Sequence, residues 1–219
     1  MQNALRTFLD QTKLSKMIRI SIIVVFTVLS SAATQSVPDE GVVTKVYDGD
    51  TIQLDSGHRV RYTGIDTAEV GEEYHDNATR LNSQLVLGKK VRLEYDKEHS
   101  DRYDRLLAYV FVIENGKEVL ANKRIVEEGF AGMYYARPQM RYFKELLEAQ
   151  RIAIKKKLGL WRYRLLETEN EYVGSKKSYT FHRKYCKSIS KLKPSNKVKF
   201  VSKADAYMQG YSACRSCKP

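Results

Sequence analysis

The stretch GVVTKVYDGDTIQLDSGHRVRYTGI, residues 41–65, decides the fold. It contains three short runs rich in β-branched and aromatic residues, and such runs favour strands. The runs cover residues 42–46, 51–54 and 59–65. Asp48-Gly49-Asp50 and Ser56-Gly57 separate them, and both segments are typical of tight turns. The stretch therefore predicts an antiparallel meander of three strands.

The residues that follow extend this meander to a barrel. Residues 73–87 carry apolar side chains at helical spacing, and Gly88 marks the expected end of that helix. Two more strands and then two more helices are predicted at residues 91–95, 106–112, 118–128 and 138–157. Five strands with a helix inserted after the third predict an α+β fold, a five-stranded OB-type β-barrel with three helices. We expect Trp161 to seal the last helix against the barrel.

The N-terminal residues 1–36 predict a targeting segment that is separate from the fold. Basic residues within 13–19 precede an apolar run at 20–29, and small residues follow at 30–33. This order is typical of a secretory signal peptide. The apolar run falls short of the roughly 20 residues that cross a bilayer, but an uncleaved anchor over residues 17–33 is the alternative. We therefore expect a protein that is secreted or held at the cell surface, with a membrane tether as the second option.

The positive charge is concentrated at the C-terminal end. Residues 175–219 hold twelve Lys and Arg against a single acid, Asp205, which accounts for +11 of the chain's net charge of +12. Such a one-sided field suits a polyanion, either nucleic acid or an anionic surface, although a solvated lysine-rich tail is the alternative. The composition shift predicts a barrel domain at 41–162, a linker at 163–174 and a small basic module at 175–219.

All three cysteines lie in this basic module. His182-x3-Cys186 and Cys214-x2-Cys217 are 27 residues apart and supply four ligands for a tetrahedral Zn²⁺ with no open position, which is typical of a structural site. A Cys214–Cys217 disulfide with Cys186 free is the alternative. Residues 210–219 resemble part of the zinc module of bacterial Ada alkylation-repair proteins, although His182 stands where that family has its first cysteine.

Six polar residues are expected to converge on one face of the barrel. They are Asp50, Arg61, Asp66, Thr67, Glu69 and Arg105. Carboxylates suit a hard cation such as Ca²⁺, and guanidinium groups suit phosphate because they offer two parallel donors. Hydrolysis of a phosphodiester needs such a cation, cationic donors for the phosphoryl oxygens, and a carboxylate that acts on water. The set predicts a metal-assisted phosphodiesterase.

Five segments closely resemble the staphylococcal nuclease (thermonuclease) family in order and spacing. They are residues 46–52, 61–69, 101–109, 126–131 and 153–161. The resemblance implies a role for each of the six polar residues. Asp50, Asp66 and the Thr67 carbonyl would bind Ca²⁺. Arg61 and Arg105 would bind the phosphate and stabilise the transition state, and Glu69 would be the general base or orient the attacking water.

The resemblance also implies a nucleotide pocket. It would be formed by Tyr103 and by one of Tyr134 and Tyr135. One departure from the family lies nearby, because Asp104 stands where the family usually has a glycine before the second arginine.

The function implied is that of an exported, Ca²⁺-dependent nuclease that cleaves DNA and RNA with little sequence preference and leaves 3′-phosphates. Lysines interleaved with aromatic residues in the basic module predict that it helps to bind nucleic acid. We expect a monomer. A non-catalytic OB-fold protein that binds nucleic acid or takes up DNA at the cell surface is the first alternative. A surface module that binds anionic wall polymer is the second.

Overall fold

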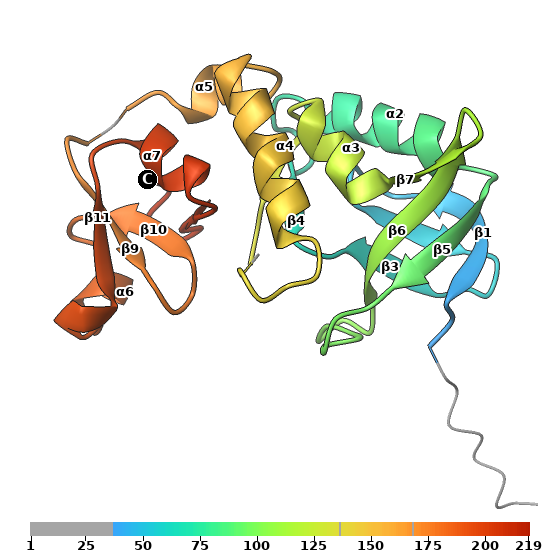
Figure 1. Cartoon of the computed structure of the whole chain (residues 1–219), viewed down its shortest axis with the longest axis horizontal. Helices are drawn as coiled ribbons and strands as arrows, with labels where there is room; N and C mark the ends of the chain where they lie inside the picture. The colour runs from blue at the N-terminus through green and yellow to red at the C-terminus, as the bar shows by residue number, and fades with distance from the viewer. Residues whose placement is uncertain (1–36, 136, 168) are drawn as a thin grey trace, which may run out of the picture. The chain divides into compact units, whose positions relative to one another are not determined.

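The computed structural model describes residues 37–135, 137–167 and 169–219, and Val37–Pro219 form one compact unit (Figure 1). The targeting segment predicted at residues 1–36 lies outside the described residues. Within the described part, no helix is both long enough and apolar enough to cross a membrane.

The predicted meander is present and closes into a barrel. The barrel strands are β1 (Glu40–Val46), β2 (Thr51–Leu54), β3 (Arg59–Tyr62), β5 (Lys90–Glu94) and β6 (Leu106–Glu114). Their order is β3-β2-β1-β5-β6 with antiparallel neighbours, and a parallel pairing of β3 with β6 completes the ring. The predicted α+β fold with a five-stranded closed barrel is confirmed.

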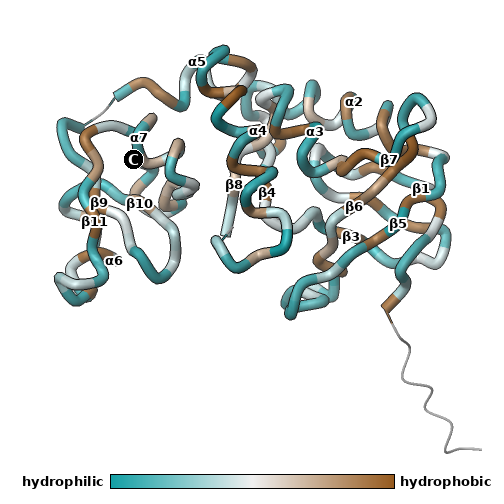
Figure 2. The backbone as a smooth tube through the Cα atoms, viewed as in Figure 1, coloured by the Kyte–Doolittle hydropathy of each residue, from teal (hydrophilic) through white to brown (hydrophobic). Residues whose placement is uncertain are grey.

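Three helices and a short fourth accompany the barrel. They are α2 (His75–Val86), α3 (Ala121–Glu127), α4 (Phe143–Lys155) and α5 (Trp161–Arg164). Figure 1 shows α2 and α3 on the same side of the barrel. Hydrophobic residues run along β6 in Figure 2, and Tyr109 and Val110 of that strand are fully buried in the barrel core.

One predicted helix begins later than expected. Residues 118–120, placed in a helix from the sequence, belong instead to β7 (Lys117–Leu120), which forms a hairpin with β6. Asn115 and Gly116 make the turn with φ values of 51° and 74°, and two positive φ values are what a two-residue hairpin turn of type I′ requires. The helical prediction was wrong there because this Asn-Gly turn signal was overlooked.

The third predicted strand is interrupted after Tyr62. Backbone pairing of β3 ends at Tyr62, Gly64 adopts φ of 80°, and the chain resumes as β4 (Ile65–Thr67). Strand β4 pairs with β8 (Ala131–Met133) rather than with the barrel strands. The interruption turns Asp66 and Thr67 away from the line of β3.

The C-terminal module is a small mixed sheet with short helices. Its elements are β9 (Tyr172–Ser175), β10 (Thr180–Arg183), α6 (Lys187–Ser190), the 3₁₀ turn η1 (Pro194–Asn196), β11 (Lys197–Phe200), α7 (Lys203–Met208) and β12 (Ser212–Ala213). The strand order is β11-β9-β10-β12. Because β9 lies inside this sheet, the module's first strand begins within the segment expected to be a linker.

Helix α4 supplies side chains to two hydrophobic cores. Its first half places Phe143, Leu146 and Ala149 in the barrel core. Its second half places Ala153 and Ile154 in a core shared with the C-terminal module. The barrel and the module are therefore joined through one helix as well as through the chain.

Two side chains strengthen this junction. Gln150 of α4 donates from Nε2 to the Tyr207 carbonyl over 2.6 Å and accepts from the Met133 amide over 2.7 Å. Trp161 packs edge-on against Tyr207 with ring centroids 5.0 Å apart. The Trp161 ring lies in the core that the second half of α4 shares with the module, and its Cη2 also faces Gly132 of β8, so Trp161 packs at the junction of the two parts.

An ion-pair network on β5 leads to a testable pH dependence. Burial raises the pKa of Glu94, but hydrogen bonds from Arg92, Tyr142 and Arg141 outweigh this effect and lower it to about 2. A carboxylate with a depressed folded-state pKa stabilises the fold above its unfolded pKa of about 4.3, and loses that contribution as the pH falls toward 2.

We expect Glu94→Gln to lower the free energy of unfolding by about 1–3 kcal/mol at pH 7, since it removes hydrogen bonds to a charged acceptor. Urea unfolding at pH 7 and pH 3 measures this difference. The gap between the two proteins should narrow at pH 3. An equal difference in the free energy of unfolding at both pH values would contradict a stabilising role for the ionised Glu94 side chain.

Candidate active site

Arg61 is the centre of the predicted site. Its side chain is 13% exposed, and its Nε lies 3.1 Å from Asp50 Oδ1 while its Nη2 donates to Asp66 Oδ1 over 2.9 Å. Its Nη1 donates to the carbonyls of Tyr62 and Ile65, each at 2.9 Å. Three hydrogen bonds and the ion pair with Asp50 thus hold this guanidinium. The structure gathers two predicted calcium ligands around one arginine.

Asp50 is held tightly against β4. It is 4% exposed, and its Oδ2 accepts hydrogen bonds from the Thr67 amide at 2.9 Å and the Thr67 hydroxyl at 3.0 Å. The preceding Gly49 makes this approach feasible, because a Cβ there would lie 2.5 Å from Ala78 Cβ and 2.7 Å from Thr67 Cγ2. The Asp48-Gly49-Asp50 turn therefore packs against both α2 and β4.

The two aspartates make the site electrostatically receptive to a cation. Burial raises the pKa of Asp50, and the nearby Arg61 opposes that rise. Burial also raises the pKa of Asp66, with Arg61 and Arg215 acting in the opposite direction. Neighbouring buried carboxylates are costly as anions unless positive charge compensates them, so a bound cation would stabilise their ionised forms.

Glu69 and Arg105 lie outside this central cluster. The Glu69 side chain is 74% exposed. Arg105 pairs with Asp101 through Nε at 2.8 Å and Nη2 at 2.6 Å. Arg105 directly precedes β6, whose Leu107 lies opposite Arg61 in the parallel β3–β6 pair. Sequence reasoning missed Asp101 as the partner of Arg105.

The predicted tyrosines fall into two groups. Tyr103 is exposed beside Arg105, whose guanidinium lies 5.5 Å from the tyrosine ring. Tyr134 and Tyr135 contact each other edge-on with centroids 4.3 Å apart. Tyr134 reaches the central cluster, because its ring lies 4.4 Å from the guanidinium of Arg215, which also binds Asp66.

Asp104 illustrates a conformational demand on the loop before β6. It adopts φ of 61°, a left-handed conformation that glycine takes without steric cost. The loop therefore keeps the backbone shape that glycine favours, although this chain has aspartate there.

Comparisons with known proteins bear on this geometry. The family described as staphylococcal nuclease homologue matches residues 59–163. A thermonuclease of Staphylococcus hyicus is 37% identical over 128 residues, which cover 54% of this chain and 73% of that protein. The chain belongs to the staphylococcal nuclease family. The predictions of this family and of a nuclease-type hydrolase are confirmed.

Two further relatives carry nuclease names. A thermonuclease of Staphylococcus intermedius is 36% identical over 129 residues, 55% of this chain and 74% of that protein. The SPbeta prophage-derived endonuclease YokF of Bacillus subtilis (strain 168) is 33% identical over 147 residues, 62% of this chain and 48% of that protein.

Behind the nuclease barrel, the structure brings the four predicted zinc ligands together. One donor atom from each of His182, Cys186, Cys214 and Cys217 lies within 4.8 Å of all the others. The three cysteines are free thiols, so the Cys214–Cys217 disulfide is not formed. The buried Nδ1 of His182 has no hydrogen-bond partner among the described residues, and burial lowers the pKa of this histidine toward the neutral form that binds metals.

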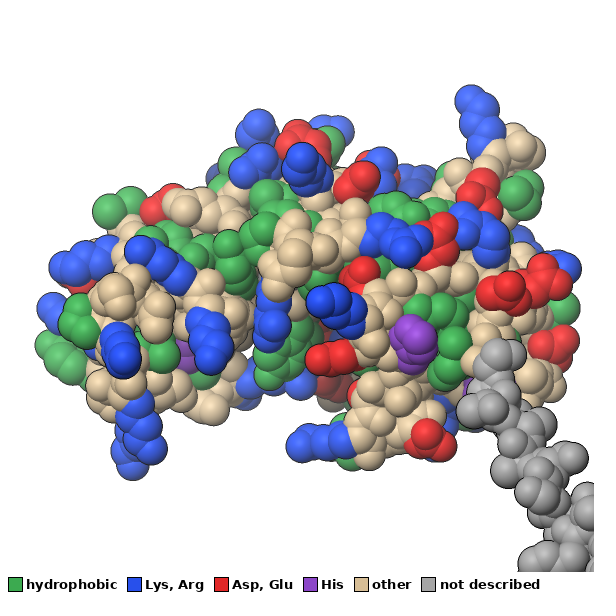
Figure 3. Space-filling model, turned by 60° about the horizontal axis from the view of Figure 1, so that its bottom comes forward, with side chains coloured by type: hydrophobic (Ala, Val, Ile, Leu, Met, Phe, Trp, Pro, Cys, Tyr) green, Lys and Arg blue, Asp and Glu red, His purple; other side chains and the backbone are tan. Residues whose placement is uncertain are grey.

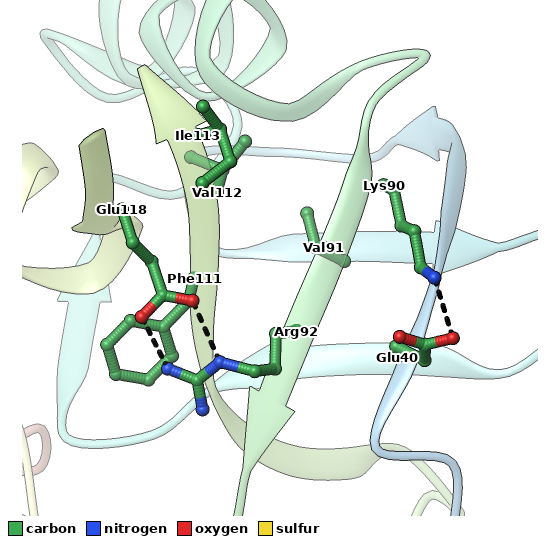
Figure 4. A pocket seen from close by; sticks show the side chains of 8 residues that line it. All are labelled: Glu40, Lys90, Val91, Arg92, Phe111, Val112, Ile113 and Glu118. Atoms are coloured by element: carbon green, nitrogen blue, oxygen red, sulfur yellow. Dashed lines mark hydrogen bonds and ion pairs between the residues drawn. The ribbon is translucent and has the colours of Figure 1, made fainter. Parts of the chain in front are cut away.

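A shallow hollow on the nuclease barrel lies apart from these residues. It has a volume of about 200 Å³ and lies over β5 and β6 (Figure 4). Ion pairs join Arg92 to Glu118 and Lys90 to Glu40 at its edges, and the Arg92 guanidinium lies 4.1 Å from the Phe111 ring. Because internal ion pairs account for these charges, we assign it no role in the site.

Proposed function

We propose that this protein is an exported, Ca²⁺-dependent nuclease that hydrolyses phosphodiester bonds of DNA and RNA and leaves 3′-phosphates. The observation that carries the proposal is the attachment of Asp50 and Asp66 to the same guanidinium, that of Arg61. Relatives named thermonuclease and endonuclease support it. A non-catalytic nucleic-acid binder would have no need of buried carboxylates beside a phosphate-binding arginine.

The residues present fit a calcium ion. Asp50, Asp66 and the Thr67 carbonyl offer the oxygen ligands that this hard cation prefers. Asp50 and Thr67 are in direct contact, and Asp66 Oδ2 has no hydrogen-bond partner among the described residues. A bound calcium ion would supply positive charge that neutralises the phosphate and orients water.

The remaining roles follow from charge and exposure. Arg61 and Arg105 bind the phosphate and meet the charge that develops on its oxygens in the transition state. Glu69 is exposed enough to reach a water molecule, which it orients or deprotonates. Tyr103, together with Tyr134 or Tyr135, contacts the nucleotide.

The C-terminal module holds zinc and adds affinity for the polyanion. Four N and S donors with no open position fit a structural tetrahedral site, whose zinc–sulfur distances of about 2.3 Å are compatible with the observed grouping. The backbone amide of Arg183 donates to Cys217 Sγ over 3.4 Å and would support a thiolate ligand. Figure 3 shows many Lys and Arg side chains and few acidic ones over this module, a surface suited to non-specific binding of DNA.

Localisation and assembly are also part of the proposal. A signal peptide in residues 1–36 would direct export, and an uncleaved segment would tether the nuclease to the membrane. We propose that the nuclease acts as a monomer, since every predicted catalytic side chain comes from a single chain.

A metal-restoration assay tests the proposed reaction. The protein is stripped with EDTA and then given zinc alone, calcium alone, or both, with labelled single-stranded DNA as substrate. We expect no cleavage with zinc alone and full cleavage with both ions, because only the carboxylate site acts on the phosphate. Mass spectrometry should find 3′-phosphates on the products. Undiminished cleavage in EDTA, or restoration by zinc alone, would contradict the proposal.

A further inference from the structure

Arg215, which sequence reasoning did not assign to the active site, lies among its residues. Its Nη2 donates to Asp66 Oδ1 over 2.8 Å and lies 3.9 Å from Glu69 Oε1. Its guanidinium also rests 4.4 Å from the ring centre of Tyr134. Arg215 comes from the Cys214–Cys217 turn of the C-terminal module, outside the matched nuclease region of residues 59–163.

The donors of Arg215 are far less engaged than those of Arg61. Arg61 makes three hydrogen bonds and one further ion pair within the protein, and its side chain is 13% exposed. Arg215 makes one hydrogen bond to the described residues, to Asp66, and its side chain is 58% exposed. Arg215 can therefore offer two parallel N–H donors to a phosphate without giving up a contact within the protein.

The backbone around Arg215 is fixed on both sides. The Cys214 amide donates to the Phe181 carbonyl and the Lys218 amide donates to the Cys214 carbonyl, each over 2.9 Å. Cys214 and Cys217 belong to the proposed zinc site. The turn that carries Arg215 is thus held by the same residues that hold the module together, which reduces the entropy lost when Arg215 binds a ligand.

We propose that Arg215 is a third phosphate-binding group of the nuclease site, supplied by the C-terminal module. This inference rests on the proposed function. In the absence of substrate, Asp66 balances the Arg215 charge. A bound strand presents phosphates to the free N–H groups of Arg215, next to the phosphate held by Arg61 and Arg105. The module therefore completes the substrate site in addition to binding DNA at a distance.

A binding assay tests this role without the need for catalysis. Fluorescence anisotropy of a labelled 12-nucleotide thymidine strand is measured with zinc-loaded protein and no added calcium. Arg215→Ala should weaken binding by about 10-fold, as expected for a lost charge-assisted hydrogen bond, and should reduce the salt slope by about 0.7. Arg215→Lys should keep the salt slope and lose part of the affinity, because it keeps the charge without the guanidinium fork.

Arg80→Ala is the matched control. It removes an exposed guanidinium of α2 that has no hydrogen bond or ion pair to the described residues, so binding should stay within about twofold of the unaltered protein. Thermal melting confirms that each variant is folded. Equal losses for Arg80→Ala and Arg215→Ala would overturn the inference. Tighter binding or faster cleavage by Arg215→Ala would also overturn it, since Arg215 would then block the site.

Failure of the inference and failure of the proposed function give different results. With calcium present, an unaltered protein that leaves the strand intact disproves the proposed function. An unaltered protein that cleaves, together with an Arg215→Ala variant that binds normally, disproves only the role of Arg215. If the inference holds, Arg215→Ala raises KM more than it lowers kcat, because the contact is made in binding.

Discussion

Replacing Arg61 by alanine is expected to lower kcat for DNA hydrolysis by about 100- to 1000-fold, the usual cost of removing one donor that stabilises transition-state charge. The change also leaves Asp50 and Asp66 without the guanidinium that joins them. Initial rates on single-stranded DNA at saturating calcium measure the effect. Circular dichroism is needed beside the kinetics, because an unpaired buried carboxylate destabilises the fold.

Arg59→Ala provides a control on the same strand. Arg59 is exposed, and its guanidinium lies 5.9 Å from the Tyr47 ring, away from the contacts of Arg61. The control should retain nearly full activity. If Arg61→Ala stays within tenfold of the unaltered protein while remaining folded, Arg61 does not stabilise the transition state and the proposed chemistry has to be abandoned.

The second large effect concerns the four proposed zinc ligands. Cys217→Ser is expected to reduce zinc content below one ion per chain and to lower the melting temperature markedly. Structural zinc sites in small domains contribute about 10–16 kcal/mol of binding free energy, and a module with so small a core depends on that energy for folding. Elemental analysis and thermal melting measure the two quantities.

Ser216→Ala serves as the control for this prediction. Ser216 lies in the same turn, is exposed and is not part of the cluster, so zinc content and melting temperature should stay unchanged. A Cys217→Ser protein that keeps stoichiometric zinc and the original melting temperature would rule out Cys217 as a ligand.

The barrel and the centre of the site were predictable because their signals are local. The Asp48-Gly49-Asp50 turn fixes the first hairpin, and its glycine is required where a Cβ would collide with Ala78. Arg61 and Asp66 are only five positions apart, so a single break in the strand at Gly64 suffices to bring their side chains together. In short segments of this kind, the residue types themselves determine the backbone conformation.

The parts that sequence reasoning missed depend on contacts between distant segments. Arg215 and Asp66 are separated by 149 positions, and nothing in either neighbourhood indicates that they meet. The sequence did not indicate that Trp161 also packs against Tyr207 of the module, because an apolar ring does not specify its partners. The β6–β7 hairpin is different, since its Asn115-Gly116 turn was a usable signal.

Helix α4 has a thermodynamic consequence for the whole described unit. Because Leu146 and Ala149 complete the barrel core while Ala153 and Ile154 complete the other, neither core can open without exposing part of a helix that the other needs. Denaturation of the two parts is then cooperative. A zinc ion bound as proposed would therefore also raise the thermal stability of the barrel, although none of its ligands belongs to the barrel, and a chelator that removed the ion would destabilise the catalytic domain.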